Sequence, residues 1–180
     1  MDSLLTETFG RAVLRSSFVV LSSAFLVLSS AAACAPPRLA GAHDSGEALA
    51  REVLDAFAKR DIEQLRALAL SEDEFRDQIW PGLPAARPER NVPVTYVWGD
   101  LHQKSDARLR ALMAERGGHR LELVELRFDG ETSRYATGTV RREPTFVVRD
   151  ERGNTQELRL CGSIVEKEGR WKVFSYVVEG

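Results

Sequence analysis

Cysteine and histidine are scarce in this chain of 180 residues, which contains two cysteines and three histidines. His43, His102 and His119 lie far apart, and no two of them have the i, i+4 spacing that places two metal ligands on one helix face. A metal centre needs several converging ligands. The phosphate-binding, dinucleotide-binding and Gly-x-Ser-x-Gly motifs are also missing from the sequence. We therefore expect a protein with no metal and no other cofactor.

An excess of positive charge is missing as well. The chain has 25 Lys and Arg against 27 Asp and Glu, a formal net charge of -2. The arginine-bearing segments 87–90 and 141–142 are each accompanied by a glutamate, Glu89 or Glu143. Solvated charge is the simplest interpretation of both segments, with anionic lipid headgroups as an alternative partner. Because nucleic-acid binding typically needs a basic patch, we expect no nucleic-acid partner.

No apolar run reaches the ~20 residues of a comfortable membrane span. The apolar stretch Phe18–Leu28 follows Arg11 and Arg15 and precedes a run of serine and alanine at 29–33. A positively charged end, a short apolar stretch and a cleavage site of small residues form an export signal. We predict such a signal over residues 1–33. Since the chain stays uncharged from 16 to 37, an uncleaved anchor is the alternative.

The signal ends in Ala-Ala-Ala followed by Cys34, which resembles the lipobox of bacterial lipoproteins. The resemblance implies that Cys34 becomes an acylated N-terminus. Each buried methylene of the acyl chains contributes ~0.8 kcal/mol, so several chains hold a protein at a bilayer. Ala31 departs from the pattern, which usually has Leu there, and Ala31-x-Ala33 also suits ordinary cleavage to a periplasmic or secreted protein. If the cell has two membranes, Ala35 in place of aspartate favours the outer one.

Composition divides the rest of the chain into two parts. Residues 34–45 contain two prolines and mostly small side chains, which predicts a lipidated Cys34 followed by a flexible tether. Residues 46–180 are long enough for one domain with its own core.

Helical periodicity dominates the first half of this domain. Apolar residues recur at helical spacing from about Ser45 to Lys59 and again over 62–68. Ser71 and Glu74 have the spacing of a capping box, which predicts a helix over Phe75 to Trp80. A longer helix is predicted over 94–116, with Gly99 as a candidate break.

The second half is strand-like. We predict strands over 121–128, 135–142, 145–149, 158–165 and 171–178, with Pro144 marking a bulge or an edge and Glu168-Gly169 closing the last hairpin. Helices followed by an antiparallel meander indicate the α+β class.

The predicted order of elements is similar to that of the nuclear transport factor two-like superfamily. It consists of two short helices, a longer helix and a sheet that ends in the segment 169–176. The segment 56–65 is also similar to the opening helix and turn of that superfamily. The resemblance covers about residues 46 to 180 and implies N-terminal helices packed on a curved antiparallel sheet that forms a cone-like pocket. Members include isomerases, dehydratases and hydrolases beside many binding or assembly modules, so the fold does not supply the function. No catalytic residue set of an enzymatic member matches this chain.

Candidate site residues fall into two groups. Asp100 and His102 are the only acid and histidine close together in the half expected to line a pocket, but at this spacing on a helix they point in different directions. A surface carboxylate and a half-buried histidine are the simpler interpretation. An apolar ligand pocket could be lined by aromatic residues, for which core packing is the alternative: Tyr96, Trp98, Tyr135, Trp171, Phe174 and Tyr176.

Three functions follow from these patterns. The first is a non-catalytic, envelope-anchored module that binds a partner protein or a small apolar ligand. The second is a small lyase, isomerase or hydrolase that uses Asp100 and His102 as an acid–base pair. The third is a structural factor in envelope assembly.

Cys161, expected in a strand, is interpreted as a small hydrophobic residue rather than a nucleophile.

Overall fold

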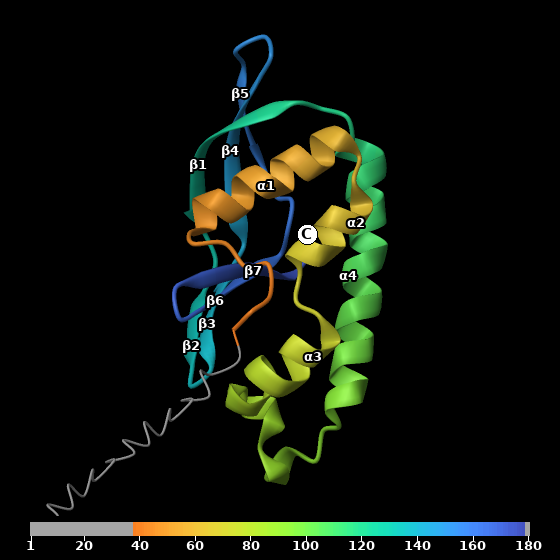
Figure 1. Ribbon diagram of the computed structural model, residues 1–180, viewed down its shortest axis with the longest axis vertical. Coiled ribbons are helices and arrows are strands. Elements are labelled where there is room, and N and C mark those ends of the chain that lie inside the picture. The colour runs from red at the N-terminus through yellow and green to blue at the C-terminus, as the bar shows by residue number, and fades with distance from the viewer. Residues whose placement is uncertain (1–37, 179–180) are drawn as a thin grey trace, which may run out of the picture. The chain divides into compact units, whose positions relative to one another are not determined.

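The computed structural model describes residues 38–178 (Figure 1). The predicted export signal, the acylation of Cys34 and the alternative uncleaved anchor lie outside these residues. Within residues 38–178, no helix is both long enough and apolar enough to cross a membrane.

Two helices open the domain, and both begin at a side-chain cap. α1 (Gly46–Lys59) follows Ser45, whose Oγ accepts a hydrogen bond of 3.0 Å from the N–H of Ala48. α2 (Ile62–Leu68) follows Asp61, whose carboxylate accepts a hydrogen bond from the third residue of that helix. A cap satisfies one of the free N–H groups at a helix start, so both predicted helices are confirmed with starts that local sequence explains.

The predicted capping box is present, but the helix that it opens is short. α3 (Glu72–Glu74) passes at once into a π-helical turn, Phe75–Ile79, where a regular helix was predicted. Three 3₁₀ turns follow, at Trp80–Gly82, Pro84–Ala86 and Pro88–Arg90. Proline at or near the start of each turn prevents the chain from continuing as an α-helix.

The long helix α4 (Val94–Arg116) is continuous. Gly99 lies inside it without a break, so the candidate break point is not used. α4 contacts α2, β7 and the π-helical turn, whereas α1 packs on β1 and also contacts β7 (Figure 1).

The strands form two antiparallel sheets rather than one. A three-stranded sheet has the order β1-β4-β5, and a four-stranded sheet has the order β2-β3-β6-β7. The α+β class is therefore confirmed, while the expectation of a single curved sheet is wrong. The strands of the described part are β1 (Leu121–Phe128), β2 (Thr132–Tyr135), β3 (Gly138–Arg142), β4 (Pro144–Asp150), β5 (Thr155–Leu158), β6 (Ser163–Lys167) and β7 (Arg170–Ser175).

The chain changes sheet at two places, and both have a local cause. Between β3 and β4 the backbone turns at Glu143, which has a φ of 51°, and Pro144 follows. A positive φ interrupts the regular ladder, and proline removes a backbone donor. The disruption predicted near Pro144 is therefore present, as a change of sheet.

The second change of sheet divides the strand predicted over 158–165 into β5 and β6. Gly162 lies in the gap, where an added Cβ would collide with the carbonyl oxygen of Val177. The Gly162 N–H donates to the carbonyl of Ser175 at 2.8 Å, and its own carbonyl accepts from the N–H of Glu143 at 2.9 Å. Through these hydrogen bonds, Gly162 at the second change of sheet contacts Glu143 at the first.

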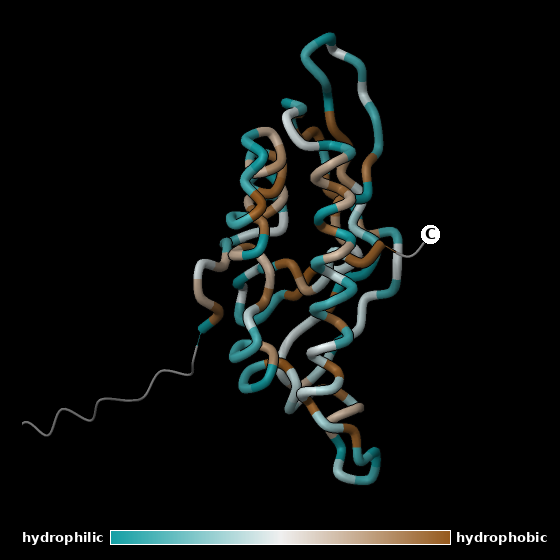
Figure 2. Tube along the Cα trace, turned by 90° about the vertical axis from the view of Figure 1, so that its right-hand side faces the viewer, coloured by the Kyte–Doolittle hydropathy of each residue, from teal (hydrophilic) through white to brown (hydrophobic). Residues whose placement is uncertain are grey.

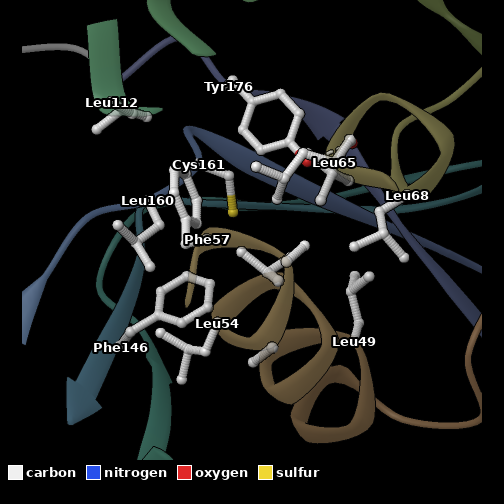
Figure 3. Packing of buried hydrophobic residues seen from close by; sticks show 14 of the residues in the cluster. Leu49, Leu54, Phe57, Leu65, Leu68, Leu112, Phe146, Leu160, Cys161 and Tyr176 are labelled. Carbon is white, nitrogen blue, oxygen red and sulfur yellow. Dashed lines mark hydrogen bonds between the residues drawn. The ribbon is translucent and has the colours of Figure 1, made fainter. Parts of the chain in front are cut away.

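The larger part of the core lies where α1, α2 and the second half of α4 meet strands of both sheets. Figure 3 shows this packing, with Phe57, Leu65, Cys161 and Tyr176 close together. Cys161 is fully buried, as expected for a small hydrophobic residue. By contrast, the turn between β4 and β5 is hydrophilic and stands away from the core (Figure 2).

The packed domain starts before residue 46, which corrects the predicted boundary of the tether. Leu39 and Ala42 are buried at 4% and 5% exposure and join a second apolar cluster. His43 exchanges two backbone hydrogen bonds with Trp171 of β7, of 3.0 and 2.8 Å. Because β7 is an edge strand, its free backbone groups accept this segment as a short extra partner. We call residues 39–43 the strap.

Candidate functional site

A cavity of about 420 Å³ lies between the first half of α4 and the four-stranded sheet. Its volume falls within the range of roughly 300–1,000 Å³ found for sites that hold small molecules. A second hollow, of about 670 Å³, lies between α1 and β1, but most of the side chains around it are charged. Apolar walls therefore distinguish the cavity beside α4.

The apolar walls of the cavity come from both of its sides. They belong to the second apolar cluster, which also contains the buried residues of the strap. A π-helical turn carries one extra residue per turn, and this one holds Phe75 against the ring of Phe174 at 6.1 Å and the ring of Trp98 at 5.3 Å. The apolar lining is made chiefly by Phe75, Val97, Leu101, Tyr135, Val140 and Phe174.

Charged side chains border the same cavity. Lys104 donates to Asp100 at 2.8 Å one helical turn away on α4, and this hydrogen bond raises the pKa of Lys104. Arg159 lies 3.0 Å from Glu143. Arg142, at the end of β3, also borders the cavity, and within residues 38–178 its guanidinium has neither an ion pair nor a hydrogen bond.

The two residues of the predicted acid–base pair lie apart. Asp100 borders the cavity and is ion-paired with Lys104. His102 does not line it, and its ring stacks on Trp98 at a centroid distance of 5.4 Å with an interplanar angle of 24°. This geometry follows from a continuous helix, on which residues two apart point in different directions.

Of the aromatic residues expected to line a ligand pocket, Tyr135 and Phe174 line the cavity. Tyr96 is 72% exposed on α4. Trp98 is packed behind Phe75 rather than against the open space. Tyr176 is 1% exposed, and its hydroxyl donates to the carbonyl of Leu65 at 2.6 Å, so it belongs to the main core (Figure 3).

Two residues that border the cavity were not singled out from the sequence as site residues. Arg142 was interpreted as solvated charge, and Ser163 carried no signal. Arg142 is two residues from Val140, and side chains two apart on a strand share a face. Since Val140 is buried at 5% exposure, this spacing could have placed Arg142 beside an apolar wall.

Reactive groups are few at this site. Burial raises the pKa of the Cys161 thiol far above its ordinary value, so the thiol stays protonated. Within residues 38–178, no three His, Cys, Asp or Glu side chains are arranged to hold a metal ion.

The chain matches no protein-family model, no curated protein and no solved structure.

Proposed function

We propose that this chain is a non-catalytic binding module, anchored in the cell envelope by lipid at Cys34, that holds a small apolar ligand in the cavity beside α4. The observation that carries the proposal is the cavity itself, with a volume of about 420 Å³ and walls built from six apolar or aromatic side chains on two opposite sides. A ligand gains affinity there mainly by removing its apolar surface from water.

The proposed kinship with nuclear transport factor two-like domains is supported by the order of the elements. Short helices precede a long helix, and antiparallel strands follow. The long helix α4 and the four-stranded sheet face each other across the cavity. Under this proposal, ligand binding in the space between helix and sheet is the role that the fold serves.

A small ligand fits the cavity better than a partner protein does. Stable protein interfaces bury ~800 Å² on each partner and usually present a broad surface. The apolar residues around the cavity face inward, and the large exposed hydrophobic residues of the described part are Val92, Tyr96 and Val124. Tyr96 and Val124 belong to different elements, α4 and β1, and form no common patch with the cavity lining.

A non-catalytic role is supported by the state of the carboxylates at the cavity. Asp100 and Glu143 are both engaged in ion pairs. A general base needs a free carboxylate or imidazole within reach of the substrate, and His102 stacks on Trp98 instead of lining the cavity. The enzymatic alternative therefore has no specific observation in its favour.

Filling the cavity tests the proposal. In the full chain carrying Cys34→Ser, which removes the predicted acylation site, we expect naphthylmethanol to bind measurably by titration calorimetry. Leu101→Trp places a larger side chain among the lining residues and is expected to weaken this binding about tenfold or more, with a modest loss of stability from overpacking.

Tyr96→Trp is the matched control, because it adds the same side chain at an exposed position of the same helix. Its affinity for naphthylmethanol should equal that of the parent chain. Equal affinity in the parent chain and in a folded Leu101→Trp variant would overturn the assignment of the cavity. If naphthylmethanol binding depends on the cavity, native mass spectrometry of protein from an envelope fraction should identify the natural ligand as an adduct of a few hundred daltons.

A further inference from the structure

Positively charged side chains outnumber negatively charged ones around the cavity. Three cationic side chains border it, Lys104, Arg142 and Arg159, against two carboxylates, Asp100 and Glu143. Lys104 and Arg159 are each held by one of these carboxylates, at 2.8 and 3.0 Å. One positive charge, that of Arg142, is left without a partner inside residues 38–178.

Arg142 belongs to a polar row across the four-stranded sheet. The strand register pairs it with Ser163 on β6, and Ser163 with Ser175 on β7. We call these three residues the polar row, and all three border the cavity. The row crosses the end of a sheet whose other cavity-lining residues are Tyr135, Val140 and Phe174.

The two serine hydroxyl groups of the polar row can each donate a further hydrogen bond. Ser163 is 9% exposed, and in the described part of the chain its side chain makes no hydrogen bond. Ser175 Oγ accepts a hydrogen bond of 3.0 Å from the N–H of Val177, which leaves its own proton free to be donated. Both hydroxyls border the cavity and can donate a proton to a ligand that carries an acceptor.

We propose that the ligand of this cavity is a small organic acid, whose apolar body lies against Phe75, Leu101 and Phe174 while its carboxylate binds the polar row. The planar fork of an arginine matches the two oxygens of a carboxylate, and the Ser163 hydroxyl supplies a further donor. The inference rests on the proposed function and specifies the chemistry of the ligand.

The neighbouring carboxylates limit the charge that this site accepts. A ligand with one negative charge neutralises the one unpaired cation. A second negative charge would meet the carboxylate of Glu143, which adjoins Arg142 in the chain, and like charges at short range disfavour each other. The site thus selects a monoanionic carboxylate over a phosphate dianion.

The test compares two probes of nearly the same shape in the full chain carrying Cys34→Ser. Naphthoate has a carboxylate where naphthylmethanol has a neutral hydroxyl group. Titration calorimetry should show naphthoate binding about tenfold more tightly, the order expected for a charge-assisted hydrogen bond at a partly exposed site. Arg142→Gln should remove this preference, chiefly by weakening the binding of naphthoate.

Arg134→Gln is the control, because Arg134 is an exposed arginine on neighbouring β2 that does not line the cavity. It should keep the full preference for naphthoate. Equal affinities for the two probes in the parent chain, or a preference that survives Arg142→Gln, would overturn the inference while the proposed binding function stands. If neither probe binds, the proposed function fails, and the inference fails with it. Tighter binding of naphthyl phosphate than of naphthoate would also overturn it.

Discussion

At the scale of single residues, a buried ion pair joins three parts of the chain. Lys172 on β7 is 3% exposed, and its Nζ donates to Glu74 Oε2 at 2.8 Å. The same carboxylate accepts from the N–H of Ser71 at 2.9 Å and from the N–H of Ala40 in the strap at 2.6 Å. Glu74 thus connects the strap, the start of α3 and the four-stranded sheet.

These contacts set the charge state of Glu74. Burial alone raises its pKa, but the hydrogen bonds from Lys172, Ser71 and Ala40 and the charge of Lys172 outweigh burial and hold the pKa below its ordinary value. A carboxyl group whose pKa is lower in the folded state adds stability above its unfolded pKa of about 4.3. The contribution is lost as the pH falls through the lower, folded pKa.

We therefore predict that Glu74→Gln lowers the free energy of unfolding by about 3–5 kcal/mol near neutral pH, because it leaves the Lys172 ammonium buried without its counter-charge. Urea denaturation measured from neutral pH downward should show the difference from wild type shrinking as the pH falls below the unfolded pKa of about 4.3 and then through the lower folded pKa, where wild-type Glu74 becomes protonated as well.

Two variants distinguish the loss of this ion pair from a nonspecific loss of stability. Glu72→Gln changes an exposed carboxylate of the same short helix and should alter stability by less than about 0.5 kcal/mol. Adding Lys172→Met to Glu74→Gln should recover part of the loss, since the uncompensated charge is then gone. A stability equal to wild type for Glu74→Gln at neutral pH would contradict the argument.

At the scale of elements, the hairpin between β6 and β7 has a two-residue turn in which glycine fits the backbone conformation and glutamate fits it poorly. Glu168 and Gly169 both have positive φ, 53° and 74°. This is the backbone of a two-residue type I′ turn, which matches the twist of the strands and favours Asn-Gly. A non-glycine residue in this conformation costs roughly 1–2 kcal/mol, and asparagine reduces the cost.

We predict that Glu168→Asn raises the free energy of unfolding by about 0.5 kcal/mol, because asparagine tolerates positive φ better than glutamate does. Thermal or urea unfolding of the purified variant measures the change. Glu151→Asn is a matched control in the other hairpin, where Glu151 does not have positive φ, and it should leave stability unchanged. A loss of stability in Glu168→Asn would mean that the glutamate side chain has a role that the turn geometry does not explain.

At the scale of the whole molecule, the strap shortens the connection to the proposed anchor. Four residues, 35 to 38, separate Cys34 from Leu39, and Leu39 is buried. The five residue steps from Cys34 to Leu39 reach at most roughly 18 Å in an extended chain. If Cys34 is acylated, the domain is therefore held close to the bilayer surface, nearer than a free tether ending at residue 45 would allow.

Under the lipoprotein proposal, we predict that Cys34→Ser moves the mature protein from the membrane fraction to the soluble fraction, because the proposed acyl chains at Cys34 would provide the anchoring. Fractionation with an intact mass measures both location and acylation. Ala35→Asp is the control, which keeps Cys34 and should stay with membranes. A mature wild-type mass without acyl chains would contradict the lipoprotein proposal.

The sequence by itself determined the features that depend on neighbours in the chain. The helix starts at Ser45 and Ser71 come from side chains that bond backbone three residues away. The turn at Glu168-Gly169 and the disruption at Pro144 come from local backbone preferences. The order of helices and strands, and with it the α+β class, follows from hydrophobic periodicity, which is also local.

Only the tertiary structure decided how distant segments meet. The division into two sheets depends on hydrogen bonds from Gly162 to Ser175 and to Glu143. The Glu74–Lys172 pair joins residues 98 apart in sequence, and the unpaired state of Arg142 depends on Arg159 and Lys104 occupying the nearby carboxylates. Long-range pairings are selected by the packing of the whole domain, so no local pattern in the sequence specifies them.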